Sequence, residues 1–86
     1  MDGRILSLVS SWLPRGKKEA NDWVAYNPNR ADRHLGSFRV NLENGKWADF
    51  AVQDAKGNSL ASLAVYVFGI SPKEAYDILR SRGLGQ

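Results

Sequence analysis

Apolar residues recur every three or four positions at the start of the chain. The spacing i, i+3, i+4, i+7 lays one apolar stripe of a helix against a core, and it is occupied by Ile5, Leu8, Val9 and Trp12. Asp2 is placed to cap the first turn of this helix, and Pro14 and Gly16 stop it. The pattern predicts an N-terminal helix followed by a basic, polar connector, which carries Lys17 and Lys18.

The middle of the chain is rich in strand-forming residues. Three strands are expected, at residues 22–26, 38–42 and 46–50. Residues 27–37 are full of turn formers and read as a loop. The second and third runs flank Asn44-Gly45, and alternating runs around Asn-Gly predict a β-hairpin.

Two registers of this hairpin are possible, and they differ in the residue pairs that each creates. A two-residue turn at Asn44-Gly45 would set Val40 opposite Asp49, an unfavourable pair. A three-residue loop sets Arg39 opposite Asp49, and it pairs apolar residues with each other, Phe38 with Phe50 and Val40 with Ala48. We expect the second register, because a register slip moves a whole set of side chains to the wrong face. It would leave on one face Arg39, Asn41, Trp47 and Asp49.

Two helices are expected in the last third of the chain. After a turn at Lys56-Gly57, Asn58 or Ser59 can cap a helix that runs to about Phe68 and is apolar nearly all round, as a buried helix is. Residues 71–74, Ser-Pro-Lys-Glu, form a capping box with proline at the first helical position. Gly83 closes this last helix.

These elements predict a single α+β domain over residues 1–86. A small three-stranded antiparallel sheet would pack with an N-terminal helix and two C-terminal helices. A chain of 86 residues supports only one core. We expect that core to contain Phe38, Val40, Phe50, Leu63 and Val67.

Composition narrows the class of protein. A hydrophobic content of 43% with 24% charged residues is globular. The chain has no cysteine, which excludes disulfides and cysteine-containing zinc sites and fits a reducing compartment. The apolar run at residues 5–13 is too short to span a membrane, so a cytoplasmic protein is expected. A net charge of +3 permits contact with a phosphate backbone without demanding it.

The residues that most enzymes need are missing from the sequence. His34 is the only histidine and falls in a polar loop, where a surface residue is expected rather than a catalytic base. No glycine-rich loop ends in the Gly-Lys-Ser/Thr that cradles phosphates. The sequence therefore predicts a non-catalytic protein with no cofactor and no bound metal.

Six short segments stand along the chain in a recognisable order. They are Leu-Pro-Arg-Gly at 13–16, Asn-Pro-Asn-Arg-Ala-Asp-Arg at 27–33, Gly-Ser-Phe at 36–38, Asn-Gly-Lys-Trp-Ala-Asp-Phe-Ala at 44–51, Ser-Leu-Ala-Val-Tyr at 62–66 and Glu-Ala at 74–75. This order resembles the N-terminal zinc-ribbon-like domain of phage and plasmid primase-helicase proteins. Those domains are related to the Cys-His-Cys-Cys zinc-binding domain of bacterial primases. The resemblance covers nearly the whole chain.

The resemblance also shows where this chain departs from the family. The four zinc-ligand positions fall at or near Asn27, Arg30, Asp49 and Val52, so all four cysteine or histidine ligands are absent. The chain also has Leu35 where many relatives have proline. Residues 57–59 are Gly-Asn-Ser where Gly-Gly-Asp is usual. The resemblance thus implies the fold without the metal, with the helices supplying stability that zinc supplies elsewhere.

In the family, the domain helps a primase engage its single-stranded DNA template. The resemblance therefore implies a template-binding module in the replication of a phage, plasmid or other mobile element. Trp47 on the polar hairpin face would stack a base. Phosphate contacts are expected from Arg39, Arg33, Lys46, Arg30, Lys17 and Lys18. Two of these residues have a competing structural role: Trp47 can equally be covered by the N-terminal helix, and for Arg30 a bond across the loop, for instance to Asp49, is favoured over a DNA contact.

A second function belongs to a different class of protein. The domain could be a docking adaptor that recruits a polymerase, primase or helicase without touching DNA, because exposed apolar patches mark protein partners. Salt separates the two hypotheses, since phosphate binding weakens steeply as salt rises and apolar docking does not.

Overall fold

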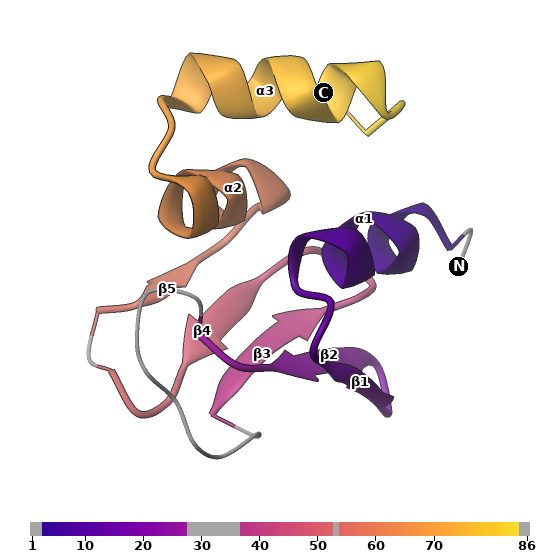
Figure 1. The fold of residues 1–86 in the computed structure, drawn as a ribbon, viewed down its shortest axis with the longest axis vertical. Helices are drawn as coiled ribbons and strands as arrows, with labels where there is room; N and C mark the ends of the chain where they lie inside the picture. Colours follow the sequence, from indigo (N-terminus) through magenta and orange to yellow (C-terminus); the bar gives the residue numbers. More distant parts are fainter. Residues whose placement is uncertain (1–2, 28–36, 53, 85–86) are drawn as a thin grey trace.

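The computed structural model describes residues 3–27, 37–52 and 54–84, which form an α+β fold (Figure 1). The described elements in chain order are α1 (Arg4–Trp12), β1 (Lys17–Glu19), β2 (Asp22–Ala25), β3 (Phe38–Asn41), β4 (Trp47–Asp49), β5 (Lys56–Gly57), α2 (Leu60–Phe68) and α3 (Pro72–Ser81). The predicted class, the N-terminal helix and the two C-terminal helices are confirmed.

The sheet is larger than the sequence predicted. The described strands form one antiparallel sheet of five strands in the order β1-β2-β3-β4-β5, so three strands was the wrong number. β1 lies in the segment predicted to be a connector, and β5 lies in the segment predicted to be a turn. Both are too short to show alternation in the sequence, and each pairs with an edge that the central strands leave open.

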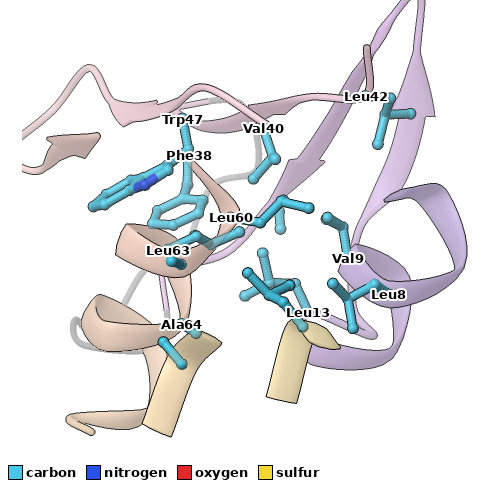
Figure 2. Packing of buried hydrophobic residues seen from close by; sticks show 14 of the residues in the cluster. Leu8, Val9, Leu13, Phe38, Val40, Leu42, Trp47, Leu60, Leu63 and Ala64 are labelled. Atoms are coloured by element: carbon cyan, nitrogen blue, oxygen red, sulfur yellow. The ribbon is translucent and has the colours of Figure 1, made fainter. Parts of the chain in front are cut away.

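The three helices lie on one side of the sheet (Figure 1). α2 packs next to the sheet and α3 packs on α2, while α1 contacts β2. Figure 2 shows the core between these layers, with Phe38 and Val40 of the sheet facing Leu63 of α2 and the α1 residues Leu8 and Val9. The predicted burial of Phe38, Val40 and Leu63 is confirmed, and Val67 packs against the core while only partly buried.

Local capping signals set the helix ends. Ser59 and Ser71 begin α2 and α3, each in a reciprocal capping box. The box at Ser71 is confirmed, and Ser59 is one of the two residues predicted as possible caps of α2. Gly69, with a φ of 65°, ends α2 in the left-handed conformation that glycine adopts without a steric penalty. α1 has Gly3 at its N-cap with no side-chain bond, and the predicted cap Asp2 lies outside the described residues.

The register of the β3–β4 hairpin differs from both registers considered above. Val40 lies opposite Trp47 and Arg39 lies opposite Ala48. The Asn41 amide donates to the carbonyl of Lys46, so the loop has four residues, 42–45. The Asn41 side chain accepts hydrogen bonds from two loop amides, which explains why the longer loop is stable.

A one-residue change of register moves side chains to opposite faces of the sheet. Trp47 and Asp49, predicted on the polar face, point into the protein and are buried. Phe50, predicted in the core, is 75% exposed, so that prediction is wrong. Hairpin pairs alone do not decide the register, because Trp47 also packs against Tyr66 of α2, outside the hairpin, with ring centroids 4.9 Å apart. Within the hairpin, Trp47 stacks on Phe38 at 5.8 Å.

Candidate nucleic-acid interface

The face of the sheet turned away from the helices, called here the outer face, is not covered by any described helix (Figure 1). Side chains alternate along each strand, so the neighbours of the core residues Ala25, Phe38, Val40 and Trp47 point to this face, and among them Val24 is itself buried. One row of paired positions runs across all five strands: Lys17, Val24, Arg39, Ala48 and Lys56. Cations therefore occupy the first, third and fifth positions of the row, with small apolar residues between them.

The spacing of this cation row follows from sheet geometry. Neighbouring strands lie about 4.8 Å apart, so the backbones of successive cationic positions are separated by about 10 Å. A line of cations on alternate strands can follow an extended polyanion that crosses the strands. The row is a property of the register and is not visible in the order of residues along the chain.

A shallow groove of about 620 Å³ lies on the outer face over β2 to β5. Its lining includes the cations Arg39, Lys46 and Lys56, and Asp22 is the acidic residue in the lining. Phe50 lines the same groove with 75% of its surface exposed. The groove thus combines an exposed aromatic ring with an excess of positive charge, the two features with which proteins bind single-stranded nucleic acid.

Arg39 at the centre of the row is held by two carboxylates. Its Nη2 donates to Oε1 of Glu19 at 3.0 Å, and its Nη1 lies 3.4 Å from Oδ2 of Asp22. The hydrogen bond and the charge of Arg39 lower the pKa of Glu19 below its ordinary value, and the bond to Glu19 raises the pKa of Arg39. The lowered pKa keeps Glu19 charged at neutral pH, and a phosphate must compete with both carboxylates for Arg39.

The DNA-binding residues predicted from the sequence separate into three groups. Arg39 and Lys46 lie together on the groove, and Lys17 lies at the β1 end of the cation row. Lys18, the next residue of β1, points to the opposite face of the sheet from Lys17, and its ammonium donates to the carbonyl of Ala20. The remaining predictions lie outside the described residues: Arg30 and Arg33.

Trp47 does not lie where a base could stack on it. It is 5% exposed, and its indole Nε1 donates to Oγ of Ser62 on α2 at 3.0 Å. The predicted stacking platform is therefore part of the core, and the ring is held by α2 rather than covered by the N-terminal helix. The correction follows from the register, which places Trp47 opposite Val40 on the inner face.

Phe50 and Lys56 are the groove residues that the sequence argument missed. Phe50 was assigned to the core by the wrong register, and Lys56 was assigned to a turn. The amide of Phe50 donates to the carbonyl of Ser37, which fixes the backbone of Phe50 at the end of the β3–β4 ladder. One signal in the sequence could have placed Phe50 correctly. Side chains alternate along a strand, so Phe50, three residues after Trp47, points to the opposite face from Trp47 and Asp49.

A buried polar cluster lies at the far end of the inner face. The Asn27 amide nitrogen donates to Oδ2 of Asp49 and to the hydroxyl of Tyr66, both at 2.7 Å. Oδ1 of Asp49 accepts from the amide of Ala51. The resemblance places zinc-ligand positions of the family at Asn27 and near Asp49, and in this protein these two residues are joined by a hydrogen bond.

Neither a metal site nor a membrane span is found in the described part of the chain. Within residues 3–27, 37–52 and 54–84, no three His, Asp or Glu side chains gather where they could hold a metal ion. His34 lies outside those ranges, so the expected lack of metal and cofactor stays a prediction. No described helix is long and apolar enough to cross a bilayer.

Comparison with known proteins finds no family model, no curated protein and no solved structure that matches this chain. The likeness to the primase domain therefore stays a resemblance in the sequence, and the function is inferred from the outer face.

Proposed function

We propose that this protein is a non-catalytic module that binds single-stranded DNA on its outer face. The observation that carries the proposal is the placement of the exposed Phe50 ring in one groove with Arg39, Lys46 and Lys56. A base stacked on an aromatic side chain contributes about 1–3 kcal/mol, and cations add affinity through the phosphates. The resemblance to primase domains suggests the setting, the template of a primase in a phage, plasmid or other mobile element.

The proposed site favours single strands over duplexes. Phe50 needs a base whose face is free, and bases in a duplex are stacked on each other. The described residues that line the outer-face groove belong to strands and loops and not to a helix. Many proteins that recognise duplex sequence insert a helix into the major groove of DNA. Weak binding with little sequence preference is therefore expected.

A titration with fluorescent oligonucleotides tests this proposal. The parent should bind an oligothymidine more tightly than a duplex of the same length at low salt. Phe50→Ala should weaken single-strand binding about 5- to 100-fold. Its melting temperature should stay close to that of the parent, because the ring is mostly exposed.

Phe68→Ala is the matched control. Phe68 is 48% exposed but lies at the end of α2, where it packs edge-on against Trp12, and it does not line the groove. Its removal should leave DNA binding unchanged. Equal binding by the parent and Phe50→Ala, or equal losses from both phenylalanine variants, would contradict the proposed site.

The second candidate is a docking adaptor for a polymerase, primase or helicase. The observation that favours it is the half-exposed Phe68 beside Trp12 on the helical side of the protein, away from the outer face. Exposed aromatic residues are typical of protein interfaces. In that case Phe68→Ala would weaken capture of the partner, and the complex would persist at high salt.

A further inference from the structure

A second hollow adjoins the outer-face groove at the edge strand β5. This edge hollow, of about 400 Å³, lies between β5 and the helices α2 and α3. Its lining includes Trp47 and Lys56, which also line the outer-face groove. The two hollows therefore meet at β5, and an extended chain that crosses the outer face along the cation row arrives at the edge hollow.

Each hollow offers one large exposed ring. Among the described residues, the large hydrophobic side chains that are exposed are Phe50, Phe68 and Tyr76. Phe50 lines the outer-face groove, and Tyr76 of α3, which is 47% exposed, lines the edge hollow. Two of the three exposed rings thus lie on one continuous path, with Lys56 between them.

The charges along the path favour the same occupant. Lys56 ends the cation row and belongs to both hollows. Asp54 is the acidic residue in the lining of the edge hollow. A phosphate is therefore favoured at Lys56, and the lining residues other than Asp54 and Lys56 are uncharged and suit a base.

We propose that the edge hollow is a second nucleotide subsite, in which Tyr76 stacks a base of the same single strand that stacks another base on Phe50. Lys56 contacts the backbone of that strand where it passes over β5. This inference rests on the proposed function and adds to it a direction, from the outer face across β5 to α3. A strand too short to cross β5 reaches only one of the two rings.

The dependence of affinity on oligonucleotide length tests this subsite. Oligothymidines from two nucleotides upward are titrated into the parent, Tyr76→Ala and Phe50→Ala at one low salt concentration. The parent's affinity should rise with length until both rings are occupied. Tyr76→Ala should bind dinucleotides as the parent does and lose about fivefold or more on long oligonucleotides. Phe50→Ala should lose affinity at every length.

Two control variants make the result specific. Tyr76→Phe keeps the ring and should bind as the parent does, whereas Phe68→Ala removes an exposed ring outside both hollows and should change nothing. Circular dichroism melting checks that every variant is folded.

The possible failures are distinguishable. If the parent binds no oligonucleotide, both the proposed function and this subsite are overturned. If Phe50→Ala weakens binding but Tyr76→Ala matches the parent at all lengths, the second subsite alone is overturned. Equal losses of Tyr76→Ala on dinucleotides and on long strands would also overturn it, because Tyr76 would then act at the first base and not at a separate one.

Discussion

Arg39 is the residue at which the charges of the outer face compete. It lies at the centre of the cation row, yet Glu19 and Asp22 hold its guanidinium at 3.0 and 3.4 Å. The two carboxylates offset the charge of Arg39. Arg39 can therefore bind a phosphate only by giving up carboxylate contacts, and Glu19 tunes how strongly the outer face attracts an anion.

Glu19→Gln should tighten single-strand binding at low salt. The change removes a negative charge from the groove border and the stronger of the two contacts on Arg39. Because the pKa of Glu19 is lowered in the folded protein, its ion pair stabilises the fold above the ordinary carboxyl pKa and is lost as the pH falls through the lowered value. Acidification should therefore tighten the parent's binding more than that of Glu19→Gln, as titrations over the acid range would measure.

Asp77→Asn is the matched control for this change. Asp77 is also an exposed carboxylate paired with an arginine, Arg80, at 2.7 Å, but the pair lies on α3 outside both hollows. If Asp77→Asn tightens binding as much as Glu19→Gln does, only net charge matters and Glu19 has no particular role.

At the scale of elements, the smallest strand has the tightest packing requirement. A Cβ added at Gly57 of β5 would lie 2.3 Å from Oγ of Ser62 and 2.5 Å from Nε1 of Trp47. These two atoms form the hydrogen bond that joins the sheet to α2. β5 can therefore approach the indole only because residue 57 has no side chain.

Gly57→Ala should destabilise the fold by about 1–3 kcal/mol, the usual cost of overpacking. Chemical denaturation measures this change. Lys56→Ala in the same strand is the control and should stay within about 0.5 kcal/mol of the parent, because the Lys56 side chain is exposed. Equal stability of the Gly57→Ala variant and the parent would show that β5 does not depend on this close approach.

Some elements could be predicted from the sequence because their signals are local. The cap of α3 could be predicted at Ser71 and that of α2 at Asn58 or Ser59, because each cap lies next to the turn it begins. The hairpin register could not be predicted from hairpin pairs alone, because Tyr66 and Ser62 of α2 hold Trp47 on the inner face. β1 and β5 could not be recognised either, since two or three residues show no period.

For the whole molecule, the residues of the proposed site also divide into those that the sequence could predict and those that it could not. Arg39 and Lys46 could be named from the sequence as cations near a hairpin. Phe50 and Lys56 could not, because their place on the outer face follows from the register and from a strand that the sequence did not show. The three helices lie on one side of the sheet (Figure 1), and the cation row lies on the other side, the face proposed to bind DNA.

The outer face should show its use of phosphates in the salt dependence of binding. For single strands, log affinity falls against log salt with a slope of about −0.7 per neutralised phosphate. Lys56 lines both hollows, whereas Lys73 is an exposed lysine of α3 that lines neither. Replacing either lysine with glutamine removes one positive charge, at Lys56 inside the proposed path and at Lys73 outside it.

The most direct measurement is therefore the salt slope of oligothymidine binding for the parent, Lys56→Gln and Lys73→Gln. The account predicts that the parent binds and that its affinity weakens steeply with salt. Lys56→Gln should make the slope shallower by about 0.7, and Lys73→Gln should leave it unchanged. Absence of binding at low salt, or equal slopes for the parent and Lys56→Gln, would contradict the claim that this face binds single-stranded DNA through its cation row.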